Sequence, residues 1–205
     1  MQDLSNVKKK ISSMSALALS MWKQTHQAFM EHDLDLLAGV LKDEDRLNNF
    51  EKEIAAELVG LARSIQDKKE KVRILAYAEA VEDLELIGDY CKDILERVQI
   101  KIEEKLMFTD DAVREYEVLY KKTEDALDEI SLALEKDNLS LVKNVLKGEQ
   151  HIDKLVDEYR SRHNERMIEG LCVPISCNMF LNMLDFTAAV YYHAKKIARN
   201  LLKIK

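Results

Sequence analysis

Residues that break helices are scarce in this sequence. Its 205 residues include one proline and five glycines. These are the two residue types least compatible with a helix interior, and they mark most turns. A chain of this length with so few of them is expected to form long helices joined by short loops. Because 47% of the residues are hydrophobic, the helices can bury a substantial core, in one domain or in two small ones.

Apolar periodicity and capping residues predict six helices. Asp33 and Thr109 are candidate N-caps of the second and fourth helices, and Asn138 is a candidate N-cap of the fifth. Pro174 fits the first turn of the sixth, because proline is tolerated there. The helices are expected at about 4–31, 34–65, 69–105, 110–135, 139–170 and 174–205.

The order of helices indicates an internal repeat. Asp33–Ile54 aligns without gaps on Asn138–Tyr159 at an offset of 105, and Asp89–Val98 aligns on Tyr192–Leu201 at an offset of 103. Apolar positions agree in both alignments, as expected for duplicated units that bury the same faces. We therefore predict an all-α fold of two tandem, pseudo-symmetric three-helix bundles, with the halves at 1–106 and 107–205.

Charge and cysteine usage limit the class of protein. The net charge is −7, which argues against nucleic-acid partners, since these require a basic face. The three cysteines, Cys91, Cys172 and Cys177, match no familiar zinc motif, so a reduced, cytoplasmic chain is the simplest interpretation. The N-terminus has no signal-peptide pattern, and no apolar run approaches about 18 residues. We expect no membrane span in this chain, although it could be the soluble end of a longer polypeptide.

A stripe of acidic residues follows the helix expected over 69–105. At 100° per residue, five carboxylates lie within about 80° of arc. Carboxylates one turn apart can hold Mg²⁺, Ca²⁺, Mn²⁺ or iron, and Glu44 and Glu51, with Asn48, could complete such a site from the second helix. The alternative is a solvated face, on which Lys92 and Arg97 relieve the repulsion. The five carboxylates are Glu82, Glu85, Asp89, Asp93 and Glu96.

The second half has lost most of this stripe. Four of its five acids are replaced, while Glu149 and Asp153 keep an acidic pair four residues apart on the fifth helix. Two of the replacements are basic, and with the neighbouring Lys195 they give three cations on the last helix, Lys195, Lys196 and Arg199. They could contact an anionic partner, such as phosphate or the cytoplasmic loops of a transporter, and the alternative is a solvated helix end.

Other chemistry finds little support in the sequence. A ferritin-like di-iron enzyme needs Glu-x-x-His pairs, and no histidine here has a glutamate three residues before it. Neither a glycine-rich phosphate loop nor a nucleophile elbow is present, so we expect no enzyme. Cys172 and Cys177 could bind a metal or pair under oxidation, although buried thiols are the simpler interpretation. His193 is expected to be a capped or surface imidazole.

Three segments resemble a known family. LELIGDYCKDI, residues 84–94, resembles the repeated signature of the PhoU family, and residues 40–54 resemble its acid-rich second helix. The stretch 164–201 is similar to the end of the PhoU-like domains attached to sodium/phosphate cotransporters. In that last signature the chain keeps His193, but Ala188 and Tyr192 stand where the family has acids.

The resemblance implies a regulator of phosphate transport and signalling that is not an enzyme. It implies a multinuclear iron or zinc cluster, with Mg²⁺, Mn²⁺ and Ca²⁺ as alternatives, and a cytoplasmic protein that docks on a phosphate transporter or sensor at the membrane. Homodimers are common in the family. An alternative is a helical adaptor that needs no metal. Together with Asp93 from the stripe, the positions that match the family's motifs give the candidate ligands Glu44, Glu85, Asp89, Asp93, Glu149 and Asp153.

Overall fold

The computed structural model describes residues 4–138, 140–147 and 149–204, with the side chains of 149–151 left aside. These residues form helices and no strands, which confirms the all-α fold, and none of the helices is long and apolar enough to cross a membrane. The helices are α1 (Leu4–Glu31), α2 (Leu34–Ser64), α3 (Lys68–Glu103), α4 (Asp110–Glu135), α5 (Val142–Lys147), α6 (Glu149–Ile168) and α7 (Pro174–Leu202).

The local start signals place most helices where the sequence predicts them. Asp33 caps α2 by accepting the Asp35 N–H at 2.8 Å. Thr109 caps α4 by accepting the Ala112 N–H at 3.2 Å. Pro174 is the first residue of α7, as predicted. Asp67, which the sequence analysis overlooked, caps α3. Each cap satisfies a backbone donor that the first helical turn leaves unpaired.

The prediction of one continuous fifth helix is wrong. The segment expected as one helix contains the short α5 and the longer α6 instead. Asn138 does not cap a helix; its side-chain oxygen accepts the Ser140 N–H at 3.1 Å and closes a turn before α5. Gly148, between the two helices in sequence, lies outside the described residues; glycine is among the poorest helix formers.

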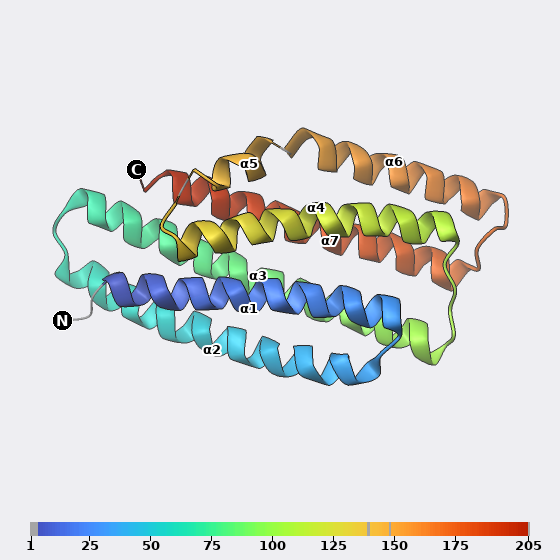
Figure 1. Ribbon diagram of the computed structural model, residues 1–205, viewed down its shortest axis with the longest axis horizontal. Helices are drawn as coiled ribbons and strands as arrows, with labels where there is room; N and C mark the ends of the chain where they lie inside the picture. The colour runs from blue at the N-terminus through green and yellow to red at the C-terminus, as the bar shows by residue number, and fades with distance from the viewer. Residues whose placement is uncertain (1–3, 139, 148, 205) are drawn as a thin grey trace.

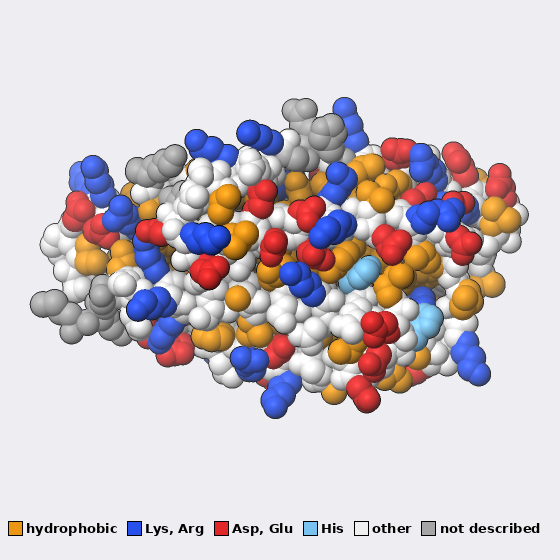
Figure 2. Space-filling model, in the orientation of Figure 1, with side chains coloured by type: hydrophobic (Ala, Val, Ile, Leu, Met, Phe, Trp, Pro, Cys, Tyr) orange, Lys and Arg blue, Asp and Glu red, His pale blue; other side chains and the backbone are white. Residues whose placement is uncertain are grey.

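Two layers of helices lie face to face (Figure 1). The first layer contains α1, α2 and α3, and the second contains α4 to α7, with α1 packed along α4 and α3 along α7. One continuous hydrophobic core runs through both layers. The boundary expected at 106/107 falls in the connection between α3 and α4, and the division into two repeats stays a prediction. On the face shown in Figure 2, basic and acidic side chains are interspersed.

Aromatic rings join α1 to α4. Trp22 stacks on Tyr120 with ring centroids 5.2 Å apart, and Phe29 meets Tyr116 edge-on at 4.8 Å. His26 also stacks on Tyr120. Burial lowers the pKa of the His26 imidazole. Residues at i, i+4 and i+7 share one helix face, so Trp22, His26 and Phe29 form a single ridge that contacts the second layer.

A buried polar cluster joins α3 to α7. Asp83 is fully buried and accepts hydrogen bonds from His193 at 2.8 Å and from Lys196 at 2.6 Å. Of the two roles expected for His193, capped or surface imidazole, the surface role is wrong, since His193 is 8% exposed. Tyr90 packs beside this cluster, against Phe186 and His193. The repeat offset of 103 relates Tyr90 to His193 and Asp83 to Phe186, so these two cross-layer contacts occupy equivalent positions.

Candidate functional site

The structure brings the acids of α2 and α3 together. Glu44 is 7% exposed, and the α3 acids beside it are partly buried, whereas Glu82 and Glu96 at the ends of the stripe are exposed. Neighbouring carboxylates from both helices act on one another electrostatically. We call this cluster the acidic face; it comprises Glu44, Glu51, Glu85, Asp89 and Asp93.

Repulsion within the acidic face is visible in its pKa values. Burial raises the pKa of Glu85, and the nearby charges of Asp89, Glu51 and Glu44 raise it further. The pKa of Asp89 is raised by burial and by Glu44. The pKa of Asp93 is raised by burial and by Glu96, against the effect of Arg97. Like charges held together favour the neutral form of an acid, and a bound cation would relieve the same repulsion.

The donor atoms of the acidic face suit an oxygen-preferring cation. Asn48 donates its amide N–H to Glu44 at 2.9 Å, and its amide oxygen is buried without a partner among the described residues. Carboxylate and amide oxygens are ligands of hard cations. The Lys92 ammonium lies 3.7 Å from the Glu44 carboxylate and partly neutralises it. These residues have the ligand chemistry of a hard-cation site, but their carboxylates are not among the described groups that bring three ligand atoms within 4.8 Å of one another. Lys92 also competes for Glu44.

Gly88 sets the distance between the two acidic helices. A Cβ at this position would lie 2.2 Å from Leu47 Cδ2. Leu47 is fully buried in α2, so it has little room to move. The glycine of the Ile-Gly-Asp motif thus lets α3 approach α2 closely, which places Glu85 and Asp89 beside Glu44.

The equivalent face of the second layer carries ion pairs. Asp153 is exposed, and its carboxylate lies 3.9 Å from the Lys195 ammonium. Asp185 pairs with Arg160 of α6. The side chain of Glu149 lies outside the described residues. Lys92 reaches toward Glu44 and Lys195 toward Asp153, so each layer has a lysine close to an acid of the neighbouring helix.

The three predicted partner-binding cations have different surroundings. Lys195 is 4% exposed, and its ammonium lies 5.3 Å from the centre of the Tyr191 ring. Lys196 is half-buried and bonded to Asp83, which raises the Lys196 pKa. Arg199 is exposed. Of the three, Arg199 is the most accessible to a partner.

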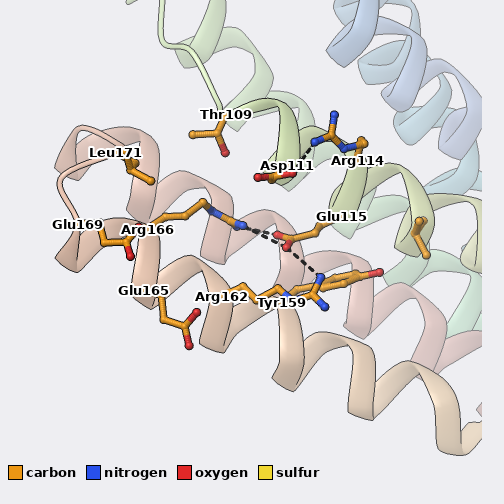
Figure 3. Close-up of a pocket in the computed structure, with 11 residues that line it drawn as sticks. Thr109, Asp111, Arg114, Glu115, Tyr159, Arg162, Glu165, Arg166, Glu169 and Leu171 are labelled. Atoms are coloured by element: carbon orange, nitrogen blue, oxygen red, sulfur yellow. Dashed lines mark hydrogen bonds and ion pairs between the residues drawn. The ribbon is translucent and has the colours of Figure 1, made fainter.

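A groove of about 590 Å³ lies between α4 and α6 (Figure 3). At its centre Glu115 accepts two hydrogen bonds from Arg166, at 3.1 and 2.6 Å. Arg162 lies 3.7 Å from the same carboxylate. Both members of the Glu115–Arg166 pair are buried. Two parallel, charge-assisted hydrogen bonds of this kind connect α4 to α6 in one geometry. This pair was not predicted from the sequence, because no distinctive pattern surrounds Glu115.

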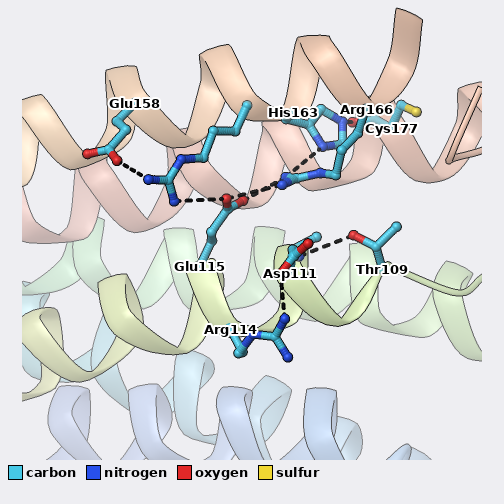
Figure 4. Close-up of polar contacts among 10 residues, drawn as sticks. Thr109, Asp111, Arg114, Glu115, Glu158, His163, Arg166 and Cys177 are labelled. Atoms are coloured by element: carbon cyan, nitrogen blue, oxygen red, sulfur yellow. Dashed lines mark hydrogen bonds and ion pairs between the residues drawn. The ribbon is translucent and has the colours of Figure 1, made fainter. Parts of the chain in front are cut away.

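Cys172 and Cys177 lie beside this groove and form a disulfide. The interpretation of these residues as separate buried thiols is therefore wrong, whereas Cys91 is free, buried and has a pKa raised to about 12 by desolvation. The ring of His163 lies next to the pair, with Nε2 2.9 Å from the Cys177 carbonyl oxygen (Figure 4). Burial and the Arg166 charge lower the His163 pKa.

Comparisons with known proteins agree with this architecture. Residues 11–98, which span most of the first layer and the whole acidic face, match the family described as PhoU domain. The chain carries a PhoU domain in these residues, and the part that the structure describes has the fold of solved PhoU proteins. No curated protein matches the chain.

Two solved structures illustrate the likeness. PhoU from Pseudomonas aeruginosa superposes with a TM-score of 0.92 at 19% identity, over 98% of this chain and 96% of the other. The phosphate transport system regulatory protein PhoU from Streptococcus pneumoniae gives a TM-score of 0.87 at 14% identity, over 100% of this chain and 96% of the other. At these identities the likeness establishes the fold.

Proposed function

We propose that this chain regulates phosphate transport and phosphate signalling without catalysing a reaction. The observation that carries this proposal is the PhoU domain match over residues 11–98, which contains the acidic face. A solved protein of the same fold is described as a phosphate transport system regulatory protein. In this proposal the chain is cytoplasmic and docks on a phosphate transporter or sensor at the membrane.

The proposed mechanism uses a metal at the acidic face. Glu44, Glu85 and Asp89, with the amide oxygen of Asn48, would supply the first ligands, and Asp93 would extend the site by one turn. A bound iron, zinc or other divalent ion would supply positive charge beside Glu85 and Asp89, whose pKa values are raised by burial and by neighbouring carboxylates. That charge would hold α2 and α3 in one arrangement and give the docking face its shape.

The second layer is proposed to depend less on metal. Asp153 has Lys195 as a counter-ion, and Asp185 has Arg160. A metal bound by Glu149 and Asp153 would have to displace the Lys195 ammonium from a nearly buried position. We therefore propose that the acidic face is the principal metal site, and that Arg199 and the half-exposed Lys196 serve as partner contacts.

The alternative function is a helical adaptor that needs no metal. Lys92 favours it, because its ammonium already lies 3.7 Å from Glu44. In that case the acidic face would contact a basic surface of the partner directly. The two functions share the phosphate-regulatory role and differ in whether metal is required.

Metal content and phosphate control together test the proposal. The protein is purified without a chelator or affinity tag, as wild type, as Glu85→Ala/Asp89→Ala and as Glu82→Ala, a matched control on the exposed end of the same stripe. Elemental analysis gives the metal content of each. In parallel, phosphate uptake is measured in a strain of the native host that lacks the chain and is complemented with each form.

The metal content and the uptake measurements together distinguish three possibilities. Metal in wild type and in Glu82→Ala, with loss of metal and of uptake control in the double variant, supports the metal-assisted mechanism. Normal uptake control by a metal-free double variant favours the adaptor. Uptake that does not change when the chain is removed or restored would overturn the phosphate-regulatory role.

A further inference from the structure

A second group of potential metal ligands lies in the second layer, where α6 is joined to α7. One ring nitrogen of His163 and the sulfurs of Cys172 and Cys177 all lie within 4.8 Å of one another. Among the described residues, this is the group of histidine, cysteine and acidic side chains that is close enough to hold one ion. Its ligands differ in type from those of the acidic face, since sulfur and imidazole nitrogen select borderline metals such as Zn²⁺.

Three separate segments supply these ligands. His163 belongs to α6, Cys172 to the connection after α6, and Cys177 to the first turns of α7. His163 is 2% exposed and Cys177 is 1% exposed, whereas Cys172 is partly accessible. Although the three cysteines make no complete zinc motif, Cys172 and Cys177 are separated by four residues, which lies within the C-x₂₋₄-C range that zinc sites use. The fold thus holds two ligands rigidly and leaves the third on a segment that solvent can reach.

The hydrogen bond of His163 suits metal binding. Its Nε2 lies 2.9 Å from the Cys177 carbonyl oxygen, and this contact holds the ring beside the two cysteines. Metal-binding histidines usually donate the other ring N–H to a carbonyl or carboxylate in this way, and the bond fixes the ring. The His163 Nδ1 atom lies 3.5 Å from the Arg166 guanidinium. If this contact were lost, Arg166 would still donate two shorter hydrogen bonds to Glu115.

The charge balance also permits a cation here. Two thiolates and one Zn²⁺ give a neutral unit, and the Arg166 charge is already compensated by the buried Glu115 carboxylate. Cys177 lies in the N-terminal part of α7, where the backbone N–H groups favour an anionic sulfur. The disulfide is the other state of the same two sulfurs.

We propose that His163, Cys172 and Cys177 form a redox-switched zinc site, with Zn²⁺ bound to the reduced cysteines and released when they form the disulfide. Water would complete the tetrahedron on the side of the accessible Cys172. In the oxidation, a small-molecule disulfide RSSR takes two electrons, one from each thiolate. The Cys172–Cys177 bond forms, the RSSR bond breaks, two RS⁻ leave, and Zn²⁺ is set free, so that charge and electrons balance.

Cobalt substitution tests this site apart from the acidic face. The full chain is reduced with a phosphine, freed of reductant under anaerobic conditions, and titrated with Co²⁺ and then with Zn²⁺. Thiolate ligands give Co²⁺ a near-ultraviolet charge-transfer band that oxygen ligands do not give. We expect this band at one Co²⁺ per chain, its loss on addition of Zn²⁺, and its loss on oxidation with glutathione disulfide.

Matched variants identify the ligands. Cys172→Ser/Cys177→Ser is expected to abolish the band, and His163→Ala to weaken Co²⁺ binding by more than about tenfold. Cys91→Ser, which removes the buried free thiol, and Glu85→Ala/Asp89→Ala are expected to leave the band unchanged. Helical circular dichroism of each variant establishes that it is folded. Absence of the band in reduced, folded wild type, or its persistence in the double serine variant, would overturn the proposal, whatever the outcome at the acidic face.

Discussion

Asp83 of α3 accepts a hydrogen bond from His193 of α7 at 2.8 Å, in the middle of the contact between the two layers. Lys196, one turn further along α7, binds the same carboxylate oxygen at 2.6 Å. Tyr90 and Phe186 make an apolar contact beside it. The offset of 103 relates Tyr90 to His193 and Phe186 to Asp83. One of these two cross-layer contacts is therefore polar and the other is aromatic.

Removal of the Asp83 carboxylate should weaken the layer contact. Asp83→Ala leaves His193 buried without its partner, and loss of one member of a buried ionic cluster costs roughly 3 kcal/mol or more. Chemical unfolding monitored by circular dichroism measures the change. The control is Glu79→Ala, which removes the exposed pair between Glu79 of α3 and Lys203 at the C-terminal end of α7 and should cost less than about 1 kcal/mol. Equal effects of the two variants would contradict the assigned role of Asp83.

Gly88 should tolerate alanine poorly. The added methyl group would overlap Leu47 at 2.2 Å, and overpacking of a core costs about 1–3 kcal/mol. Gly39→Ala is the matched control, because its nearest neighbour would be Gln24 at 3.5 Å. Alanine in an open helix position stabilises by about 0.5–1 kcal/mol. Thermal unfolding should therefore shift in opposite directions for the two variants, and a stabilised Gly88→Ala protein would argue against close packing at this position.

The acidic face should make the metal-free protein less stable as the pH rises. The pKa values of Glu85 and Asp89 are raised in the folded state, so the folded protein binds protons more tightly than the unfolded chain. Their contribution is fully favourable below about pH 4, the ordinary range of these acids, and is lost as the pH rises through the raised values.

Neutral variants of these two acids provide the measurement. In the presence of a chelator, Glu85→Gln/Asp89→Asn should be more stable than wild type at pH 7, by less than about 1 kcal/mol because water still reaches both side chains. The difference should disappear near pH 4. Glu82→Gln, at an exposed position, should change little at either pH. Added divalent metal should stabilise wild type and leave the double variant unchanged; a wild type that is the more stable form in chelator at pH 7 would contradict the repulsion.

Arg166 should contribute to the stability of the folded protein chiefly by pairing with the buried Glu115 carboxylate. Arg166→Met leaves that carboxylate without its two hydrogen bonds, and the expected cost is about 3–5 kcal/mol. Glu115→Leu/Arg166→Met removes both charges and should recover much of the loss, a coupling that a double-mutant cycle measures directly. Arg114→Met, which breaks the exposed Arg114–Asp111 pair, should be nearly neutral. Additive costs at Glu115 and Arg166 would show that the two residues act independently.

Sequence periodicity determined the elements of this protein. Asp33, Thr109 and Pro174 mark helix starts because caps and proline act on the nearest backbone groups, and these effects need no tertiary contact. The acidic stripe of α3 follows from the helical period in the same way. The sequence predicts a helix cap at Asn138, where the structure has a turn, because a side-chain oxygen of this kind can either cap a helix or close a turn. The division into α5 and α6 was not predicted.

Tertiary structure alone decided which of these side chains meet. Asp83, His193 and Lys196 come together across 110 or more positions of sequence, and the same is true on a smaller scale for Glu115 with Arg166 and for His163 with the Cys172–Cys177 disulfide. The sequence gives the face of each helix, because that depends on a period of 3.6 residues. It leaves open how far each helix slides along its neighbour, since that depends on packing at positions such as Gly88 and Leu47.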